Sequence, residues 1–326
     1  MQTLTLGDAT LHRVTELDRW PFPAADLFPG ISRQSLERAR RQLGEQFIDP
    51  GSGDVILGIH TYLIRTPTAT ILVDSGNGNN KHRPGLLAHH MFSTDYLARL
   101  ASVGVTRENV DIVVCTHLHP DHCGWNTLLS DGQWTPTFTR AVYLFARAEF
   151  DARAAACRCT ATNAVEADLS ATFADSVAPV VASGQARIVD TPHVLHDADG
   201  VRVTIRDAPG HTPGHVLVAV ESGSGPSAVI TGDIIHHPLQ FDALDLAQAG
   251  DHHQALAAAT RRELCETYAD RDVIILTAHF AGPAAGRIIR SGEGYRFAWL
   301  GEPAASAQRV PATGRDSRPT TGETMD

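Results

Sequence analysis

The sequence predicts a layered α/β protein, and three observations support this prediction. First, short apolar runs such as residues 111–116 and 272–277 have the length and the β-branched content of buried strands. Second, segments with helical spacing lie between such runs, as at residues 93–104 and 243–269. Third, four predicted strands run directly into a histidine or an aspartate, and α/β proteins place their chemistry at the carboxyl ends of strands.

The expected elements begin with a hairpin, because residues 3–6 and 9–17 alternate apolar and polar side chains. Residues 20–50 predict a loop and then a short helix with Ser32 as its N-cap. An alanine-rich helical insertion is expected at residues 145–185. The remaining strands are expected at residues 60–66, 68–74, 111–116, 141–145, 201–208, 227–233 and 272–279.

One domain over residues 1–300 accounts for these elements. Within it, residues 20–50 are expected to form a lid or a dimer arm, and residues 145–185 form the helical insertion. Residues 301–326 contain few large apolar side chains, which predicts a flexible C-terminal tail.

Composition limits the classes of function. The 326 residues, 43% of them hydrophobic, can bury one large core or two modest ones. A net charge of −10 provides no basic face for nucleic acid, and no apolar run approaches the length of a membrane span. The N-terminus lacks the pattern of a secretory signal, and the five cysteines do not form the dense framework of small secreted domains. We therefore expect a cytoplasmic protein with free thiols that binds neither nucleic acid nor membranes.

The stretch HLHPDH carries three histidines and an aspartate directly behind a predicted strand. Imidazole and carboxylate bind zinc, and a catalytic zinc site leaves one position open for water. Residues two apart on an extended backbone point the same way, so His117 and His119 can bind one ion. Pro120 then turns the chain, and Asp121 and His122 are suited to a second ion. A single histidine is more often packed or solvated, but four such groups behind an apolar strand favour a metal site.

The stretch THLHPDH resembles the H-x-H-x-D-H signature of the metallo-β-lactamase superfamily, which includes glyoxalase II-type thioesterases and N-acyl homoserine lactone lactonases. The resemblance implies a four-layer αββα sandwich with a pair of metal ions at the strand ends. Later motifs match the family's other ligands: APGHTPGH supplies His211, ITGD supplies Asp233, and LTAH supplies His279. The resemblance thus implies that Asp233 bridges two ions, one held by His117, His119 and His211 and the other by Asp121, His122 and His279.

The chemistry that the resemblance implies is that of a dinuclear hydrolase. Two divalent ions, with zinc favoured over manganese, iron or cobalt, would ionise a shared water molecule near neutral pH. We expect a small-molecule substrate, with an N-acyl homoserine lactone or another lactone or ester favoured. Organophosphotriesters, thioesters, β-lactams and activated aryl halides are alternatives, because the same nucleophile attacks them all. An iron-loaded redox protein and a structural zinc module are alternatives of other classes, and a homodimer is expected from the resemblance alone.

Further residues are expected around the metals. Asp121 is expected either to pass a proton to the leaving group or to act as a ligand alone. His236 stands where similar lactonases often carry a tyrosine, and we expect it to contact the substrate oxygen, with a packing role as the alternative. Other residues are expected to orient ligands or to bind substrate: Asp74, His215, His237 and Phe280. An apolar pocket wall is expected from Phe22, Phe28, Phe92, Trp125 and Phe280.

Overall fold

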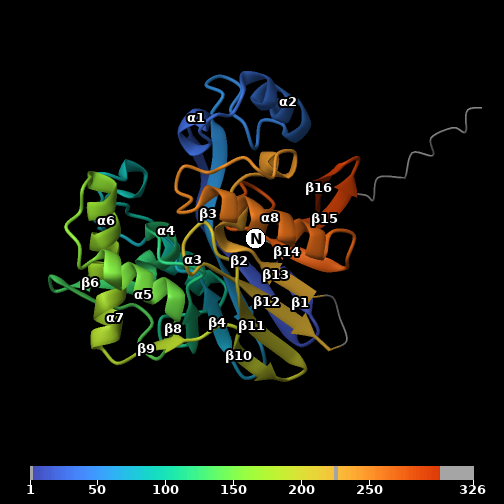
Figure 1. Cartoon of the computed structure of the whole chain (residues 1–326). Coiled ribbons are helices and arrows are strands. Elements are labelled where there is room, and N and C mark those ends of the chain that lie inside the picture. The colour runs from blue at the N-terminus through green and yellow to red at the C-terminus, as the bar shows by residue number, and fades with distance from the viewer. Residues whose placement is uncertain (1–2, 224–226, 302–326) are drawn as a thin grey trace, which may run out of the picture.

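The computed structural model describes residues 3–223 and 227–301, which form two seven-stranded sheets packed face to face (Figure 1). The first sheet has the strand order β1-β2-β3-β4-β5-β8-β9 and the second runs in sequence order from β10 to β16. The strands of the first sheet are β1 Thr3–Leu6, β2 Ala9–Phe22, β3 Val55–Arg65, β4 Thr70–Val73, β5 Ile112–Val114, β8 Val142–Ala146 and β9 Ala186–Val189. Those of the second are β10 His193–Ala198, β11 Val201–Asp207, β12 Val216–Ser222, β13 Ser227–Ile230, β14 Val273–Leu276, β15 Ala285–Ser291 and β16 Gly294–Trp299. A small hairpin, β6 Thr127–Ser130 and β7 Gln133–Pro136, stands apart from both sheets.

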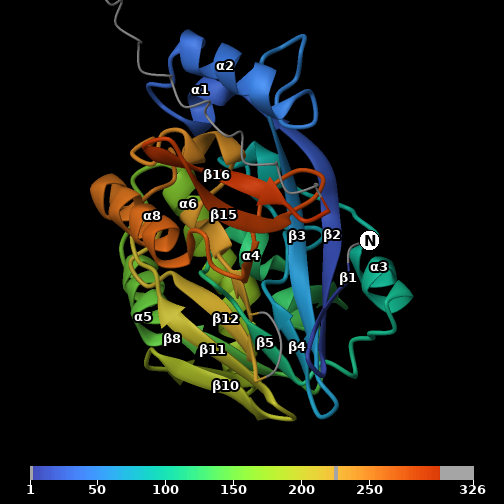
Figure 2. The same cartoon turned by 90° about the vertical axis from the view of Figure 1, so that its right-hand side faces the viewer.

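Helices cover the outer faces of both sheets, which confirms the expected αββα sandwich. Figure 2 shows α8 outside the second sheet and α3 outside the first. The α-helices are α1 Ala24–Leu27, α2 Arg33–Leu43, α3 Tyr96–Ser102, α4 Pro120–Cys123, α5 Arg147–Ala156, α6 Ala164–Thr172, α7 Ala178–Ala182 and α8 Gln254–Tyr268. The short helical turns are η1 Leu87–His89, η2 Gly124–Asn126, the π-helix η3 Phe173–Val177, η4 Gly232–Ile234 and η5 Pro238–Phe241.

The central strands are apolar throughout because both of their faces are buried. In β12, Val218 and Val220 face the core between the sheets, while Leu217 and Ala219 face the core that includes residues of α8. The same alternation occurs in β4. Ile71 lies between the sheets, whereas Leu72 points the other way and packs toward α3. Successive side chains of a strand point to opposite faces, so a strand covered on both sides shows a continuous apolar run.

The strands that precede the candidate ligands end along one edge of the sandwich. In the first sheet, β4 and β5 pair in parallel. In the second sheet, β13 and β14 pair in parallel, and β11 runs in the same direction because β12 is antiparallel to both β11 and β13. The carboxyl ends of these strands therefore gather the segments that follow them, as the sequence predicted.

Several sequence predictions are confirmed in detail and others need correction. The N-terminal hairpin forms, and Ser32 caps α2 by accepting a hydrogen bond from the Ser35 amide at 3.0 Å. The helix expected over residues 243–269 is shorter, because residues 243–253 form turns and α8 begins at Gln254. The expected insertion at residues 145–185 contains α5, α6, η3 and α7. The C-terminal tail, expected over residues 301–326, lies beyond the described residues except for its first residue.

The five cysteines all carry free thiols. Cys115 and Cys123 are buried. Within residues 3–223 and 227–301, none of the helices combines the length and the apolar composition that crossing a membrane would need.

Replacing Gly124 by alanine is expected to destabilise this fold. A Cβ at this position would overlap with the backbone carbonyl of Asn77, which cannot move aside as a flexible side chain could. We expect the free energy of unfolding to fall by about 3 kcal/mol, as for a severely overpacked site. Urea denaturation followed by circular dichroism measures the change. Gly51→Ala is the matched control, because Gly51 is exposed and an added Cβ meets the Asp49 carboxylate at 3.4 Å; an equal loss in both variants would contradict the explanation.

Candidate metal centre

The seven residues that the sequence singled out as ligands lie together at the edge of the sandwich. The ligand atoms of His117, His119, His211 and Asp233 all lie within 4.8 Å of one another. A second group with the same spacing consists of Asp121, His122 and His279. The structure therefore brings together side chains that are up to 162 positions apart, since 279 − 117 = 162.

Asp233 lies between the two groups and presents one oxygen mainly to each. Its Oδ2 atom lies 3.3 Å from His211 Nε2 and 3.7 Å from His117 Nε2. Its Oδ1 atom lies 3.2 Å from His122 Nε2 and 3.1 Å from His279 Nε2. A carboxylate with one oxygen directed at each set of imidazoles has the position of a bridging ligand.

The spacing of the nitrogens fits a bound cation. His119 Nδ1 lies 2.9 Å from His211 Nε2, and His122 Nε2 lies 3.3 Å from His279 Nε2. Two nitrogens that bind one tetrahedral zinc ion at about 2.0–2.1 Å are about 3.3 Å apart. In addition, the buried His117 Nε2 has no hydrogen-bond partner among the described residues. A buried imidazole nitrogen needs a partner, and a metal ion would supply it.

Supporting groups fix which nitrogen faces the cluster in three of the five histidines. Nδ1 of His122 donates to Asp74 at 2.9 Å, and Nδ1 of His211 donates to Asp251 at 3.0 Å. Nδ1 of His279 donates to the Gly58 carbonyl at 3.0 Å. In each case the neutral ring keeps its proton on Nδ1, so Nε2 is the nitrogen that can bind a metal ion.

Burial and charge set the protonation states around the cluster. Burial lowers the pKa values of His117 and His119 well below the ordinary range, so both rings are neutral near pH 7. Burial also acts to lower the pKa of His122, but the carboxylates around this ring, with Asp233 foremost, outweigh that effect and raise it. A metal ion binds the neutral ring, so binding would displace a proton from His122.

Asp74 directly follows β4 and has a left-handed backbone conformation, with φ of 58°. Besides His122, its carboxylate accepts hydrogen bonds from the Thr116 amide at 2.7 Å and the Thr116 hydroxyl at 2.9 Å. It therefore ties the end of β4 to the segment that leads into His117. A strained non-glycine residue at a strand end is typical of functional sites.

Of the other expected residues, His215 contacts a ligand residue, whereas His237 and Phe280 lie away from the pocket. His215 Nε2 accepts a hydrogen bond from the Asp233 amide at 2.9 Å, and burial lowers the pKa of His215 to about 3, which keeps it a neutral acceptor. His237 turns away from the pocket and donates to the Phe47 carbonyl at 2.9 Å. Phe280 lies in the aromatic core, 5.3 Å from the ring of Phe297. Neither of these two residues lines the pocket, and the expectation that they orient ligands or bind substrate stays a prediction.

A pocket of about 660 Å³ opens above the cluster. Its floor holds His119, Asp121, His211, Asp233 and His279, and Phe22 is the one aromatic residue of the expected wall that lines it. The other four were expected in loops beside the ligands, but Phe28, Trp125 and Phe280 are buried and none of the four lines the pocket. The remaining lining is mainly apolar: Trp20, Leu27, Leu57, Leu86, Leu87, Ala88, Val165 and Leu169.

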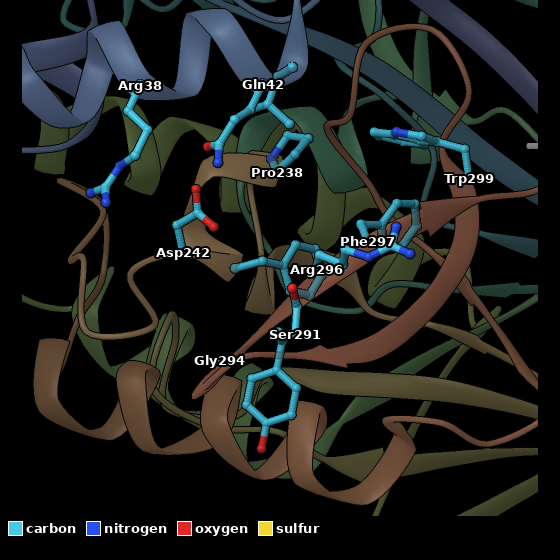
Figure 3. Close-up of a pocket in the computed structure, with 12 residues that line it drawn as sticks. Arg38, Gln42, Pro238, Asp242, Ser291, Gly294, Arg296, Phe297 and Trp299 are labelled. Atoms are coloured by element: carbon cyan, nitrogen blue, oxygen red, sulfur yellow. The ribbon is translucent and has the colours of Figure 1, made fainter. Parts of the chain in front are cut away.

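A second cavity, of about 500 Å³, lies between α2 and the β15–β16 hairpin. Figure 3 shows Arg38 reaching toward it from α2, with Asp242 below and Trp299 on the opposite side. No histidine or cysteine lines this cavity, and Asp242 is its one carboxylate among the described residues. The ligand groups thus belong to the larger pocket.

Sequence reasoning missed several carboxylates that support the site. Asp251 lies in a segment that was expected to be helical, and its side chain accepts from His211. Glu149 of α5 accepts from the Leu118 amide at 3.0 Å and the Gly214 amide at 3.2 Å, and so connects two ligand loops. An acid on a predicted helix indicates a solvated face, so the sequence carries no local signal for either role.

The sequence model of the Metallo-beta-lactamase superfamily matches residues 55–279. The chain belongs to this superfamily. Membership of the metallo-β-lactamase superfamily, together with the histidine and aspartate cluster, supports a metal-dependent hydrolase. A comparison with curated proteins finds no match in sequence.

Solved structures share the metallo-β-lactamase fold. The dizinc quorum-quenching lactonase AidC, in complex with its N-hexanoyl-L-homoserine product, is 17% identical with a TM-score of 0.74 over 91% of this chain and 96% of that one. The hydrolase AbOPH of the beta lactamase superfamily is 23% identical, also with a TM-score of 0.74 over 91% and 96% of the two chains. An N-acyl homoserine lactone hydrolase with bound N-hexanoyl-L-homoserine is 19% identical, with a TM-score of 0.55 over 85% and 94% of the two chains. At these identities the likeness establishes the fold.

Removing metal from the purified protein is expected to lower its melting temperature by about 5 °C or more, because bound ions stabilise only the folded chain. Calorimetry with and without a chelator measures the shift, and plasma mass spectrometry counts the ions. His117→Ala should bind fewer ions and lose most of the shift. His252→Ala is the control, because His252 is exposed and lies outside the ligand groups. Unchanged metal content in His117→Ala would contradict the assignment.

Proposed function

We propose that this protein is a dinuclear metal-dependent hydrolase that opens small lactones, with N-acyl homoserine lactones as the favoured substrates. The observation that carries the proposal is the placing of two ligand groups around one shared carboxylate, Asp233, at the floor of a mainly apolar pocket. The homoserine products bound to the two lactonases of the same fold support this choice of substrate.

The lining of the pocket favours an uncharged substrate. Among the residues that the structure describes, neither lysine nor arginine lines it, so a bound anion would find no cationic side chain of this part of the chain there. β-Lactam antibiotics carry a carboxylate, whereas an acyl lactone is neutral. The apolar lining suits the alkyl part of such a lactone, and the polar floor suits its ester group.

His117, His119 and His211 would hold one ion, Asp121, His122 and His279 the other, and Asp233 would contact both. The mixture of imidazole and carboxylate ligands suits zinc, with iron, cobalt or manganese as alternatives. When bound, two such ions lower the pKa of water toward neutrality and polarise the carbonyl of the substrate.

Asp121 is the proposed proton carrier. It lines the pocket, and although burial acts to raise the pKa of its carboxyl, the surrounding imidazoles, with His122 foremost, lower it overall. Asp121 is therefore a carboxylate near pH 7. From this position it would accept a proton from the attacking water and transfer it to the alkoxide released when the lactone ring opens.

His236 is the residue that we propose contacts the substrate oxygen. It lines the pocket, and its Nε2 lies 3.1 Å from Asp233 Oδ2. Its Nδ1 has no hydrogen-bond partner among the described residues. Burial lowers the pKa of His236, so the ring is neutral at pH 7 and has one N–H, which the Asp233 carboxylate favours on Nε2. This N–H would be shared between Asp233 and the substrate oxygen, while Nδ1 remains an acceptor.

A substrate panel tests the proposed function. We expect acyl lactones to be hydrolysed with kcat/KM at least about 100-fold higher than a phosphotriester, a thioester or a cephalosporin, because a neutral ester with an alkyl chain suits the pocket. The assay is run with zinc and with chelator, and chelator should abolish the activity. Preference for another substrate would overturn the lactonase assignment, and oxygen reduction by iron-loaded protein would favour the redox alternative.

His236→Ala is expected to lower kcat on lactones by about 100-fold, because a donor to the developing oxyanion is lost. Steady-state kinetics measures the loss, and the metal content should stay that of the wild-type protein. The ring of His236 is also close enough to Asp233 and His279 to belong to a ligand group. A fall in metal content would therefore reassign His236 as a ligand, and an unchanged kcat would remove it from the mechanism.

A further inference from the structure

One wall of the substrate pocket consists of the loop between β4 and α3. Residues 85–89 of this loop line the pocket and include Leu86 and Leu87. Leu87 is 76% exposed, whereas Asp233 on the floor is 3% exposed, so this wall forms the rim of the pocket. The apolar residues Val165 and Leu169 of α6 complete the rim.

The loop is held on α6 by a buried carboxylate. Asp168, which is 3% exposed, accepts hydrogen bonds through Oδ2 from the Gly85 amide at 2.7 Å and the Leu86 amide at 2.8 Å. Asp168 follows Val165 by three positions and precedes Leu169, so all three lie on the same side of α6. The residue that holds the loop therefore lies among the residues that line the rim.

The loop also touches the backbone of α6. A Cβ at Gly85 would clash with the carbonyl group of Ala164, and the Gly85 backbone has an ordinary negative φ. Glycine at this position is thus explained by close approach of the loop to the helix, and the approach brings the Gly85 amide to Asp168.

A second buried carboxylate anchors the start of the loop. Asp175 of η3 lies 2.8 Å from Arg83 Nη2 and 3.4 Å from Lys81 Nζ. The Lys81 ammonium also donates to the Thr127 hydroxyl at 2.7 Å and lies 3.5 Å from the centre of the Trp134 ring. Ion pairs this well buried fix geometry, because separating the partners would leave an unpaired charge buried.

From these contacts we propose that Asp168 is a positioning residue that fixes residues 85–89 as the rim of the pocket and so determines how well long apolar substituents bind. The inference rests on the proposed lactonase function, since it concerns the alkyl chain of that substrate. The part of a lactone that reacts lies on the floor, whereas a long alkyl chain extends to the rim. Loss of the Asp168 carboxylate should therefore weaken the binding of long chains and leave the reacting group in place.

The test compares lactones with a four-carbon and a ten-carbon acyl chain. In Asp168→Ala, KM for the ten-carbon lactone should rise about tenfold, as expected when charge-assisted hydrogen bonds are lost, while KM for the four-carbon lactone and both kcat values change less than about twofold. Asp168→Asn should give an intermediate effect, because an amide oxygen accepts but carries no charge. Gly85→Ala should reproduce the selective rise in KM. Equal changes for both chain lengths, or none, would overturn the proposal.

Glu166→Ala is the matched control, because it removes an exposed carboxylate from the same helix that caps the Thr162 amide instead of the loop. It should leave both KM values unchanged. Hydrogen exchange of residues 83–91 provides a readout that does not depend on activity, and exchange should speed up in Asp168→Ala and Asp168→Asn but not in the control. If the wild-type protein hydrolyses neither lactone, the proposed function fails. In that case unchanged exchange in both Asp168 variants would overturn the positioning role, and faster exchange would support it.

Discussion

The crowding of imidazoles and carboxylates around Asp233 is the constraint on which the rest of the structure depends. Five histidines and two aspartates direct their lone pairs into a space where Asp233 and four of the histidines, including His117, are almost fully buried. Lone pairs about 3 Å apart repel one another unless a proton or a cation lies between them. The fold can keep this arrangement because three of the rings, those of His122, His211 and His279, are also held from behind, by Asp74, Asp251 and a backbone carbonyl.

This arrangement requires that the two sheets are held in one position relative to each other. The Val216 amide of the second sheet donates at 2.9 Å to the carbonyl of Thr116, which follows β5 of the first sheet and precedes His117. The Gly58 amide of β3 donates to the His279 carbonyl at 2.8 Å, while its own carbonyl accepts from the ring of His279. Ligands from both sheets are thus linked by backbone hydrogen bonds at the edge where the strands end. Packing of apolar side chains between the sheets would not by itself set these positions so closely.

The sequence predicted much of the fold and the composition of the cluster, because both have local signals. Apolar runs that end in histidine or aspartate mark strand ends, and the HLHPDH spacing is readable without coordinates. The surrounding contacts have no such signal. Asp168 is 83 positions from Gly85 and Asp251 is 40 positions from His211, so each looks like an ordinary surface acid until the chain is folded. Phe280 adjoins a ligand in sequence but points into the core, because successive residues of an extended chain face opposite sides.

The hydrogen bond from His237 to the Phe47 carbonyl has a mechanical consequence for the N-terminal segment. Phe47 also stacks on Trp299, with ring centres 5.0 Å apart, so it is held from two directions. His237 directly follows His236, and the Gln240 side chain accepts a hydrogen bond from the His236 amide at 2.8 Å. A displacement of the segment that carries α1 and α2 would therefore be transmitted through the His237 ring to His236, which lines the pocket.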